Sequence, residues 1–208
     1  MGVLVMQGIA NVKDSAALAE EKAALSGWLR EQYASREIIR ADATLGAYAR
    51  YYKQFKKTYH VFHQIESVAV KGKPIPRVNA LVEAMFMAEL WHGLLTAGHD
   101  LDAITGAVTL DCATGEEKYE TMSGEVKTLK AGDMFVRDQA GVLSSIIYGP
   151  DKRTQITETT QRVLFTTYAV AGVSAKAVWA QMEDIVRRVR VFSPEAETTR
   201  IAVYPDRV

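Results

Sequence analysis

Histidine and cysteine have the widest chemical range of any residues in this 208-residue sequence, and the sequence contains few of them. His60 and His63 lie one helical turn apart, which would place both rings on one helix face and suggests a metal-binding pair. The rest of such a site is missing, because no H-E-x-x-H run is present and Cys112 is the only cysteine. We therefore predict neither a metal nor another cofactor.

Cys112 would be a nucleophile only with a neighbouring base and an electropositive setting. The flanking string LDCAT supplies neither, so we predict that Cys112 is a small residue of a strand. The sequence also lacks the G-x-S-x-G, G-x-x-x-x-G-K-[ST] and G-x-G-x-x-G patterns. Hydrolase-elbow and nucleotide-loop chemistry therefore have no support in the sequence.

Two polar segments that contain glycine are candidates for a site. Thr96–Asp102 follows a predicted helix, and Arg137–Gly141 is a predicted turn between strands. Loops at the edge of a sheet often carry functional residues, although turns need the same residue types for conformation alone. His99 titrates near neutral pH when unperturbed, with a pKa of about 6.5, and is the candidate catalytic base. The alternative is a ring that only packs.

A basic stripe interleaved with tyrosines is the best local candidate for contact with RNA phosphates. The alternative is a solvated helix face, since helix surfaces are routinely charged. The stripe consists of Arg50, Lys53, Lys56, Lys57, Lys71, Lys73 and Arg77.

The overall composition limits what this stripe can do. The 25 basic and 25 acidic residues cancel, so RNA would have to bind a local patch and not a global positive field. A single cysteine excludes an intramolecular disulfide and favours a reducing compartment, so we expect a cytoplasmic protein. The first residues do not resemble a secretory signal, and no stretch approaches the ~20 apolar residues that span a membrane.

Apolar residues at helical spacing predict four helices before residue 93. We expect them over residues 14–33, 42–55, 62–72 and 78–91, the third ending at Gly72 and the last at Gly93. Proline cannot continue helical pairing, so the KPIP string at residues 73–76 separates the third helix from the fourth.

The pattern changes after Asp102 to short runs that contain β-branched residues and are separated by glycines, which predicts strands. A helix over 174–188 and a strand over 201–204 follow, and Val3–Val5 is expected to form a first strand. Helices, then strands, then a helix indicate an α+β fold with a mixed or antiparallel sheet, here as one domain over 1–208. The expected strands are 107–110, 117–121, 126–129, 134–137, 142–148 and 163–170.

Two longer stretches together resemble the B3/B4 domain, the tRNA-binding and editing domain of phenylalanyl-tRNA synthetase β subunits. In RVNALVEAMFMAELWHGLLTAGHDLD, the residues Asn79, Gly93, Asp100 and Asp102 match the family pattern of a helix leading into a polar loop. In AGDMFVRDQAGVLSSIIYGPDKRTQITETTQRVLF, the matching residues are Asp133, Asp138, Gly141, Gly149, Thr157, Glu158, Thr159 and Thr160. The resemblance covers roughly residues 45–170 and is greatest to the free-standing members.

The resemblance implies a pocket that recognises an amino acid attached to tRNA. In the synthetase the domain clears tyrosine from mischarged tRNA, and a loop histidine and a strand glutamate shape the pocket. Ala97 and Thr166 stand at these two positions here, so tyrosine-specific editing is in doubt, because a site that reads a phenol hydroxyl needs a polar partner.

The candidate site is expected where the 96–102, 137–141 and 153–160 segments meet. One hypothesis is a stand-alone tRNA-binding protein that recognises aminoacyl-tRNA and hydrolyses a mischarged ester, with His99 as the catalytic candidate. The other is a non-catalytic module that binds an amino-acid-like small molecule or RNA. The predicted substrate-binding residues are Asn79, Asp100, Asp102, Arg137, Gly141, Arg153, Thr157 and Thr159.

Overall fold

Four antiparallel strands form the sheet at the centre of the molecule, in the order β10-β1-β9-β2. The computed structural model describes residues 1–205. Alternate residues of β1, among them Leu4 and Met6, are buried, as expected for a strand with one face on the core. The strands are β1 (Gly2–Gln7), β2 (Thr96–Asp100), β9 (Val163–Thr167) and β10 (Glu197–Val203).

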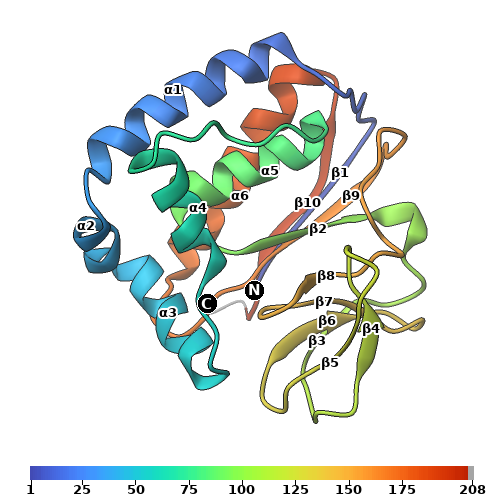
Figure 1. Ribbon diagram of the computed structural model, residues 1–208. Coiled ribbons are helices and arrows are strands. Elements are labelled where there is room, and N and C mark those ends of the chain that lie inside the picture. The colour runs from blue at the N-terminus through green and yellow to red at the C-terminus, as the bar shows by residue number, and fades with distance from the viewer. Residues whose placement is uncertain (206–208) are drawn as a thin grey trace.

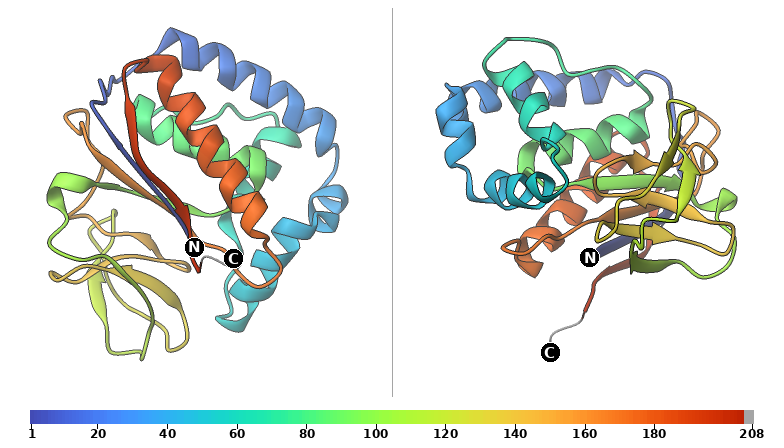
Figure 2. Two further views of the ribbon diagram at one scale, coloured as in Figure 1. Left: turned by 180° about the vertical axis from the view of Figure 1, so that it is seen from behind. Right: turned by 60° about the horizontal axis from the view of Figure 1, so that its bottom comes forward.

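A layer of helices covers one side of this sheet (Figures 1 and 2). Ser15, Asp42, Asn79 and Ser174 each accept a hydrogen bond from the backbone N–H three residues later, which fixes where four of the helices begin. Gly93 ends α5 in the left-handed conformation, with φ 69°. The helices are α1 (Ala16–Gln32), α2 (Arg36–Ala41), α3 (Ala43–Gln54), α4 (His60–Ala69), α5 (Ala80–His92) and α6 (Ala175–Phe192).

A smaller all-strand part lies beside the edge strand β2 (Figure 1). Its four strands pair in the order β3-β6-β7-β8, and a separate hairpin joins β4 to β5. The bounds are β3 (Thr109–Cys112), β4 (Lys118–Glu120), β5 (Val126–Thr128), β6 (Met134–Arg137), β7 (Val142–Ser145) and β8 (Gly149–Pro150). A turn of 3-10 helix, Leu101–Ala103, connects β2 to this part.

The predicted α+β class and the order of its helices and strands are confirmed. The structure adds α2 and β8, extends the last helix to Phe192, and starts the last strand at Glu197. The expected 142–148 strand ends at Ser145.

The largest correction concerns Thr96–Asp102, which was predicted to be a loop. Thr96–Asp100 is strand β2, an edge strand paired along its length with β9. Its string TAGHD has little intrinsic strand propensity, so pairing with β9, whose residues come more than 60 positions later, overrides the local sequence. Within residues 1–205, no helix has the length and apolar character needed to cross a membrane.

Candidate ligand-binding site

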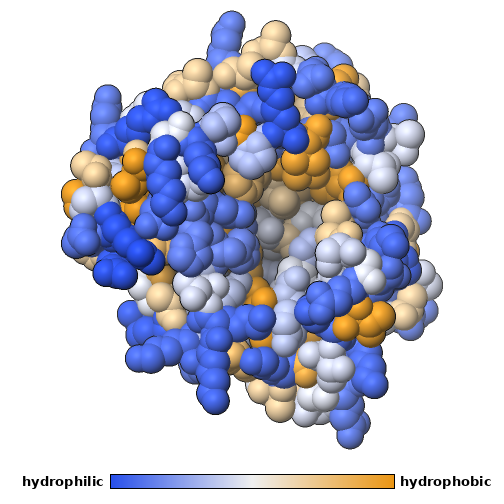
Figure 3. Space-filling model, viewed as in Figure 1, coloured by the Kyte–Doolittle hydropathy of each residue, from blue (hydrophilic) through white to orange (hydrophobic). Residues whose placement is uncertain are grey.

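A largely enclosed cavity of about 260 Å³ lies between α5, β2 and β8. Figure 3 shows a hollow at the centre of this face of the molecule. Its wall combines apolar side chains with a few polar groups, which is typical of sites for small molecules. The apolar side chains include Val78, Val82, Met85, Leu95, Met122 and Ile156, and the polar residues include His60, Asn79, Glu89, Thr96, Ser145 and Gln155.

The cavity runs from the surface towards the core. Val78 and Met122 lie at its outer end, because their side chains remain 52% and 44% exposed. Thr96, with 6% exposure, marks the inner end. A ligand would therefore enter between two exposed apolar residues and reach a buried polar end.

Glu89 places a carboxyl group among these inner residues. The residue is 4% exposed, and its Oε1 accepts a hydrogen bond from the backbone N–H of Thr96 at 3.0 Å. Burial raises the pKa of Glu89 to about 8, and the Thr96 N–H offsets only part of this effect. The carboxyl is therefore mainly protonated at neutral pH and can donate a hydrogen bond to a ligand.

Asn79 joins the start of α5 to the cavity wall. Its Oδ1 accepts hydrogen bonds from the Val82 N–H at 3.1 Å and from Asn11 Nδ2 at 3.2 Å. Its own amide nitrogen makes no hydrogen bond within residues 1–205 and is available to a ligand in the cavity that Asn79 lines. Of the predicted substrate-binding residues, Asn79 is the one that lines this cavity.

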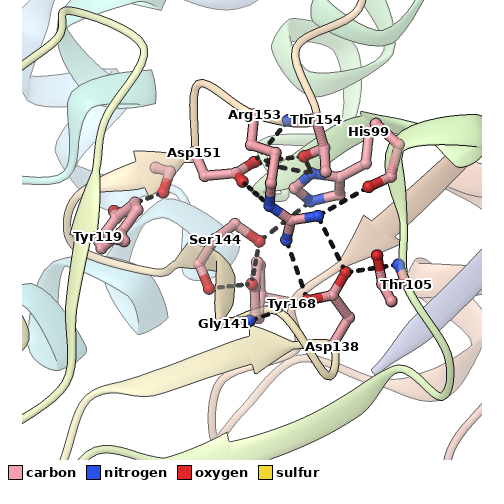
Figure 4. A network of polar contacts seen from close by, with 12 residues as sticks. His99, Thr105, Tyr119, Asp138, Gly141, Ser144, Asp151, Arg153, Thr154 and Tyr168 are labelled. Atoms are coloured by element: carbon pink, nitrogen blue, oxygen red, sulfur yellow. Dashed lines mark hydrogen bonds and ion pairs between the residues drawn. The ribbon is translucent and has the colours of Figure 1, made fainter.

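His99 lies in a buried polar network on β2 (Figure 4). Its Nδ1 is 2.8 Å from Thr154 Oγ1 and its Nε2 is 3.2 Å from Ser144 Oγ. Ser144 Oγ is in turn 2.6 Å from the hydroxyl of Tyr168, a residue that lines the cavity. The network therefore connects His99 to the cavity wall through two hydroxyl groups.

The His99 ring itself is 0% exposed and does not line the cavity. Burial, together with the nearby charge of Arg153, lowers the pKa of His99 to about 4, so the imidazole is neutral. Both ring nitrogens are engaged by hydroxyl groups. In this geometry His99 holds the cavity wall in place, and its role as a catalytic base stays a prediction.

Arg153 lies at the surface side of the network and makes a bidentate ion pair with Asp138, with N–O distances of 3.0 and 3.1 Å (Figure 4). Burial disfavours charge on Asp138, but hydrogen bonds from the Thr105 N–H and the Arg153 guanidinium hold its pKa below the usual value. The Gly141 N–H also donates to Asp138, at 3.0 Å. The predicted meeting of the 96–102, 137–141 and 153–160 segments thus takes the form of a polar network beside the cavity.

The other predicted substrate-binding residues lie outside the cavity, and their binding roles stay predictions. Asp100 accepts a hydrogen bond from Thr160 at 2.7 Å. Three further contacts, all near the surface, are Asp102 with Arg162 at 2.6 Å, Arg137 with Asp111 at 3.1 Å, and Thr157 with Thr159 at 2.9 Å.

The predicted basic stripe divides into two groups with different neighbours. Arg50, Lys53, Lys56 and Lys57 belong to α3 and the turn after it. Lys71 pairs with Glu66 at 3.2 Å. Lys73 and Arg77 are exposed on the connection between α4 and α5.

Ala97 and Thr166, which the predicted resemblance aligns with the synthetase's histidine and glutamate, are direct partners across β2 and β9. The Thr166 hydroxyl is buried and makes no hydrogen bond within the described residues. Glu89 lines the cavity and was not among the predicted site residues. A carboxyl four residues after Met85 on an otherwise apolar face was the signal that could have identified it.

The antiparallel sheet, its helical layer and the cavity at the sheet edge define an α+β domain with one candidate ligand-binding cavity at the edge strand. The B3/4 domain family matches residues 44–190 of the sequence, and the chain belongs to this family. The predicted resemblance is thereby confirmed.

Two individual proteins are similar to the chain. The phenylalanine–tRNA ligase beta subunit of Mycoplasma pneumoniae is 31% identical over 88 residues, which are 42% of this chain and 11% of that protein. An N-terminal fragment of the phenylalanyl-tRNA synthetase beta subunit from Pyrococcus horikoshii superposes with a TM-score of 0.54 at 12% identity, over 96% of this chain and 50% of the fragment. The chain thus spans only a small part of the curated relative, and the likeness to the fragment concerns the fold alone.

Proposed function

We propose that the chain binds the aminoacyl group of an aminoacyl-tRNA in the cavity and hydrolyses a mischarged ester in trans. The observation that carries this proposal is the cavity of about 260 Å³ with the buried carboxyl group of Glu89 among its inner residues. This volume lies near the lower limit of ligand pockets, so it suits an amino acid better than a large cofactor. Membership of the B3/4 family supports tRNA as the carrier, which would place the protein in the cytoplasm.

The direction of the cavity supports an ester that enters side chain first. The tRNA end is too large for the cavity and stays outside, near Val78 and Met122, while the amino-acid side chain points towards Glu89. Hydrolysis adds water to the ester carbonyl and breaks its bond to the ribose oxygen, which leaves with a proton. Such esters are intrinsically labile, so held water and oriented hydrogen-bond donors suffice without a nucleophilic side chain.

The alternative is a non-catalytic module that binds an amino-acid-like small molecule. The engaged nitrogens of His99 favour this alternative, because the buried imidazole cannot reach a ligand without rearrangement. Both functions use the same cavity and differ only in whether the bound ester is hydrolysed.

A panel of correctly charged and mischarged aminoacyl-tRNAs, scored for binding and for loss of the ester, tests the proposal. Val82→Phe should fill the cavity and abolish both binding and ester loss. Val82→Ala should leave binding intact, because the smaller side chain only enlarges the cavity. Binding without ester loss would select the non-catalytic module. Equal binding by the wild type and both variants would show that the cavity is not the site.

A further inference from the structure

Tyr148, in the turn between β7 and β8, brings together lysines from two distant parts of the chain. The Lys57 ammonium lies 4.7 Å from the centroid of the Tyr148 ring, and the Lys127 ammonium lies 5.9 Å from it. A cation over an aromatic face gains little at an exposed site. Two like charges gathered around one ring repel each other, and a bound anion would relieve that repulsion.

The turn after α3 adds a third lysine in an unusual conformation. Lys56 has φ 56°, and it is the one non-glycine residue with positive φ within residues 1–205. A side chain there strains the backbone, a strain that glycine would avoid. Such strain is commonly kept where the side chain has a role.

Lys130 draws the segment after β5 against the same turn. Its ammonium donates a hydrogen bond to the backbone carbonyl of Phe55, the residue that ends α3, at 2.6 Å. Lys56 and Lys130 therefore line one shallow depression. We call Lys56, Lys57, Lys127, Lys130 and Tyr148 the lysine–tyrosine cluster.

Most of the positive charge in this cluster is not balanced by a neighbouring carboxylate. Lys127 pairs with the exposed Glu125, but Lys56, Lys57 and Lys130 make no ion pair within the described part of the chain. Lys71, in the other half of the predicted stripe, is neutralised by Glu66. Because the whole chain has zero net charge, the cluster is a local positive feature and not part of a general one.

Two of the three chain segments that form the cluster continue into residues that line the cavity. Tyr148 directly precedes Gly149, and Lys57 comes three residues before His60. Gly149 and His60 both line the cavity, and His60 is exposed. An extension of a cavity ligand that leaves past Gly149 or His60 would come near the lysine–tyrosine cluster.

We infer that the lysine–tyrosine cluster binds the single-stranded end of the RNA whose aminoacyl group occupies the cavity. This inference rests on the proposed function and names the part of the ligand that the cluster would hold. Lysine ammoniums pair with backbone phosphates, and the Tyr148 ring offers a face on which a base can stack. Neither contact requires a particular base sequence.

The test measures binding of a short single-stranded RNA at several salt concentrations, by fluorescence anisotropy. Lys57→Gln combined with Lys127→Gln should weaken binding about tenfold at low salt and reduce the slope of log affinity against log salt by about 0.7 per lost phosphate contact. The matched control combines Lys13→Gln with Lys176→Gln, two exposed lysines outside the predicted stripe, and should change neither quantity. Equal losses in both pairs, or no loss in the first, would overturn the inference.

Two further measurements make the outcome specific. Tyr148→Leu removes the π face while keeping an apolar side chain, and should weaken single-stranded RNA binding without changing the salt slope. Duplex RNA of the same length should bind more weakly than the single strand, and equal binding would show only a general phosphate surface and contradict the inference.

Failure of the inference is distinguishable from failure of the proposed function. Thermal-shift titration with the free amino acids reports on the cavity, and a hit should persist in the lysine double variant. A cavity hit with unchanged RNA binding in that variant would overturn the inference alone. RNA binding that depends on Lys57 and Lys127, with no cavity ligand and no ester loss, would overturn the proposed function while leaving a phosphate-binding surface.

Discussion

Glu89 Oε1 accepts a hydrogen bond from the backbone N–H of Thr96, seven residues further along the chain. This contact bridges the end of α5 to the first residue of the edge strand β2. It also fixes one carboxyl oxygen and leaves the other for a ligand. The same side chain thus connects the packing of the helix to the polarity of the cavity.

Glu89→Gln should change how stability depends on pH. Because burial raises the folded-state pKa of Glu89 from 4.5 to about 8, the folded wild type binds the proton more tightly than the unfolded chain does. Its stabilising contribution is therefore complete below the unfolded value and is lost as pH rises from 4.5 to 8, by at most about 1.4 kcal/mol per pH unit. Denaturant titrations at pH 5, 7 and 9 should show that the decline is smaller in Glu89→Gln, and parallel curves would contradict the assignment.

Asn79→Ser should weaken ligand binding more than it weakens the fold. Serine caps a helix about as well as asparagine, so the loss of stability should stay near 1 kcal/mol, from the missing Asn11 contact. Losing the amide donor should lower affinity for the cavity ligand up to about tenfold. Isothermal titration calorimetry with the cavity ligand measures this affinity. Ser174→Asn, the reverse exchange at the start of α6, is the control and should leave the affinity unchanged.

Lys56→Gly should stabilise the fold while weakening RNA binding. Glycine adopts the positive φ of this position without strain, so we expect a gain of about 0.5–1 kcal/mol in the free energy of unfolding. Lys57 does not have a positive φ, so Lys57→Gly relieves no backbone strain and should be neutral or destabilising. A loss of stability in Lys56→Gly, measured by chemical denaturation, would show that the lysine is held there for packing.

His99→Phe and His99→Ala separate a catalytic role from a packing role. Removing the buried ring in His99→Ala should cost about 2–4 kcal/mol, because it leaves a void and deprives Thr154 and Ser144 of their partner. If His99 only packs, His99→Phe keeps ester hydrolysis or ligand binding. If His99 is a base, both variants lose the reaction, and melting curves would show that His99→Phe remains folded.

The chain should not clear tyrosine from phenylalanine tRNA at the rate of a synthetase editing domain. Ala97 offers no polar group at the synthetase's histidine position, and the Thr166 hydroxyl opposite it is buried. A site without a matching polar partner gains little from the phenol hydroxyl. Side-by-side deacylation assays with an intact synthetase decide the matter, since comparable rates would refute this interpretation.

Most of the helices were predictable because their ends carry local signals. Asp42 and Gly93 mark helix ends through contacts within a few residues, and both positions were identified from sequence alone, whereas the short helix α2 and the Asn79 cap of α5 were not. Strand β2 has no such signal, because it depends on β9 for all of its pairing. Predictions from sequence succeeded where the stabilising contact is close along the chain.

The candidate site was only partly predictable for the same reason. The polar segments expected to meet do so around Asp138 and Arg153, but the cavity lies beside them, against α5. Glu89 gains its properties from burial, which depends on the whole fold. Lys127 meets Tyr148 only once β5 packs beside the turn that follows β7.

The position of β1 has a consequence for synthesis on the ribosome. β1 pairs with β9 and β10, whose partner residues begin more than 150 positions later. Since the chain emerges from its N-terminus at about 5–20 residues per second, the VLVM string of β1 remains without strand partners for roughly ten seconds or longer. An unpaired apolar strand of this kind is a natural target for a chaperone that binds nascent chains.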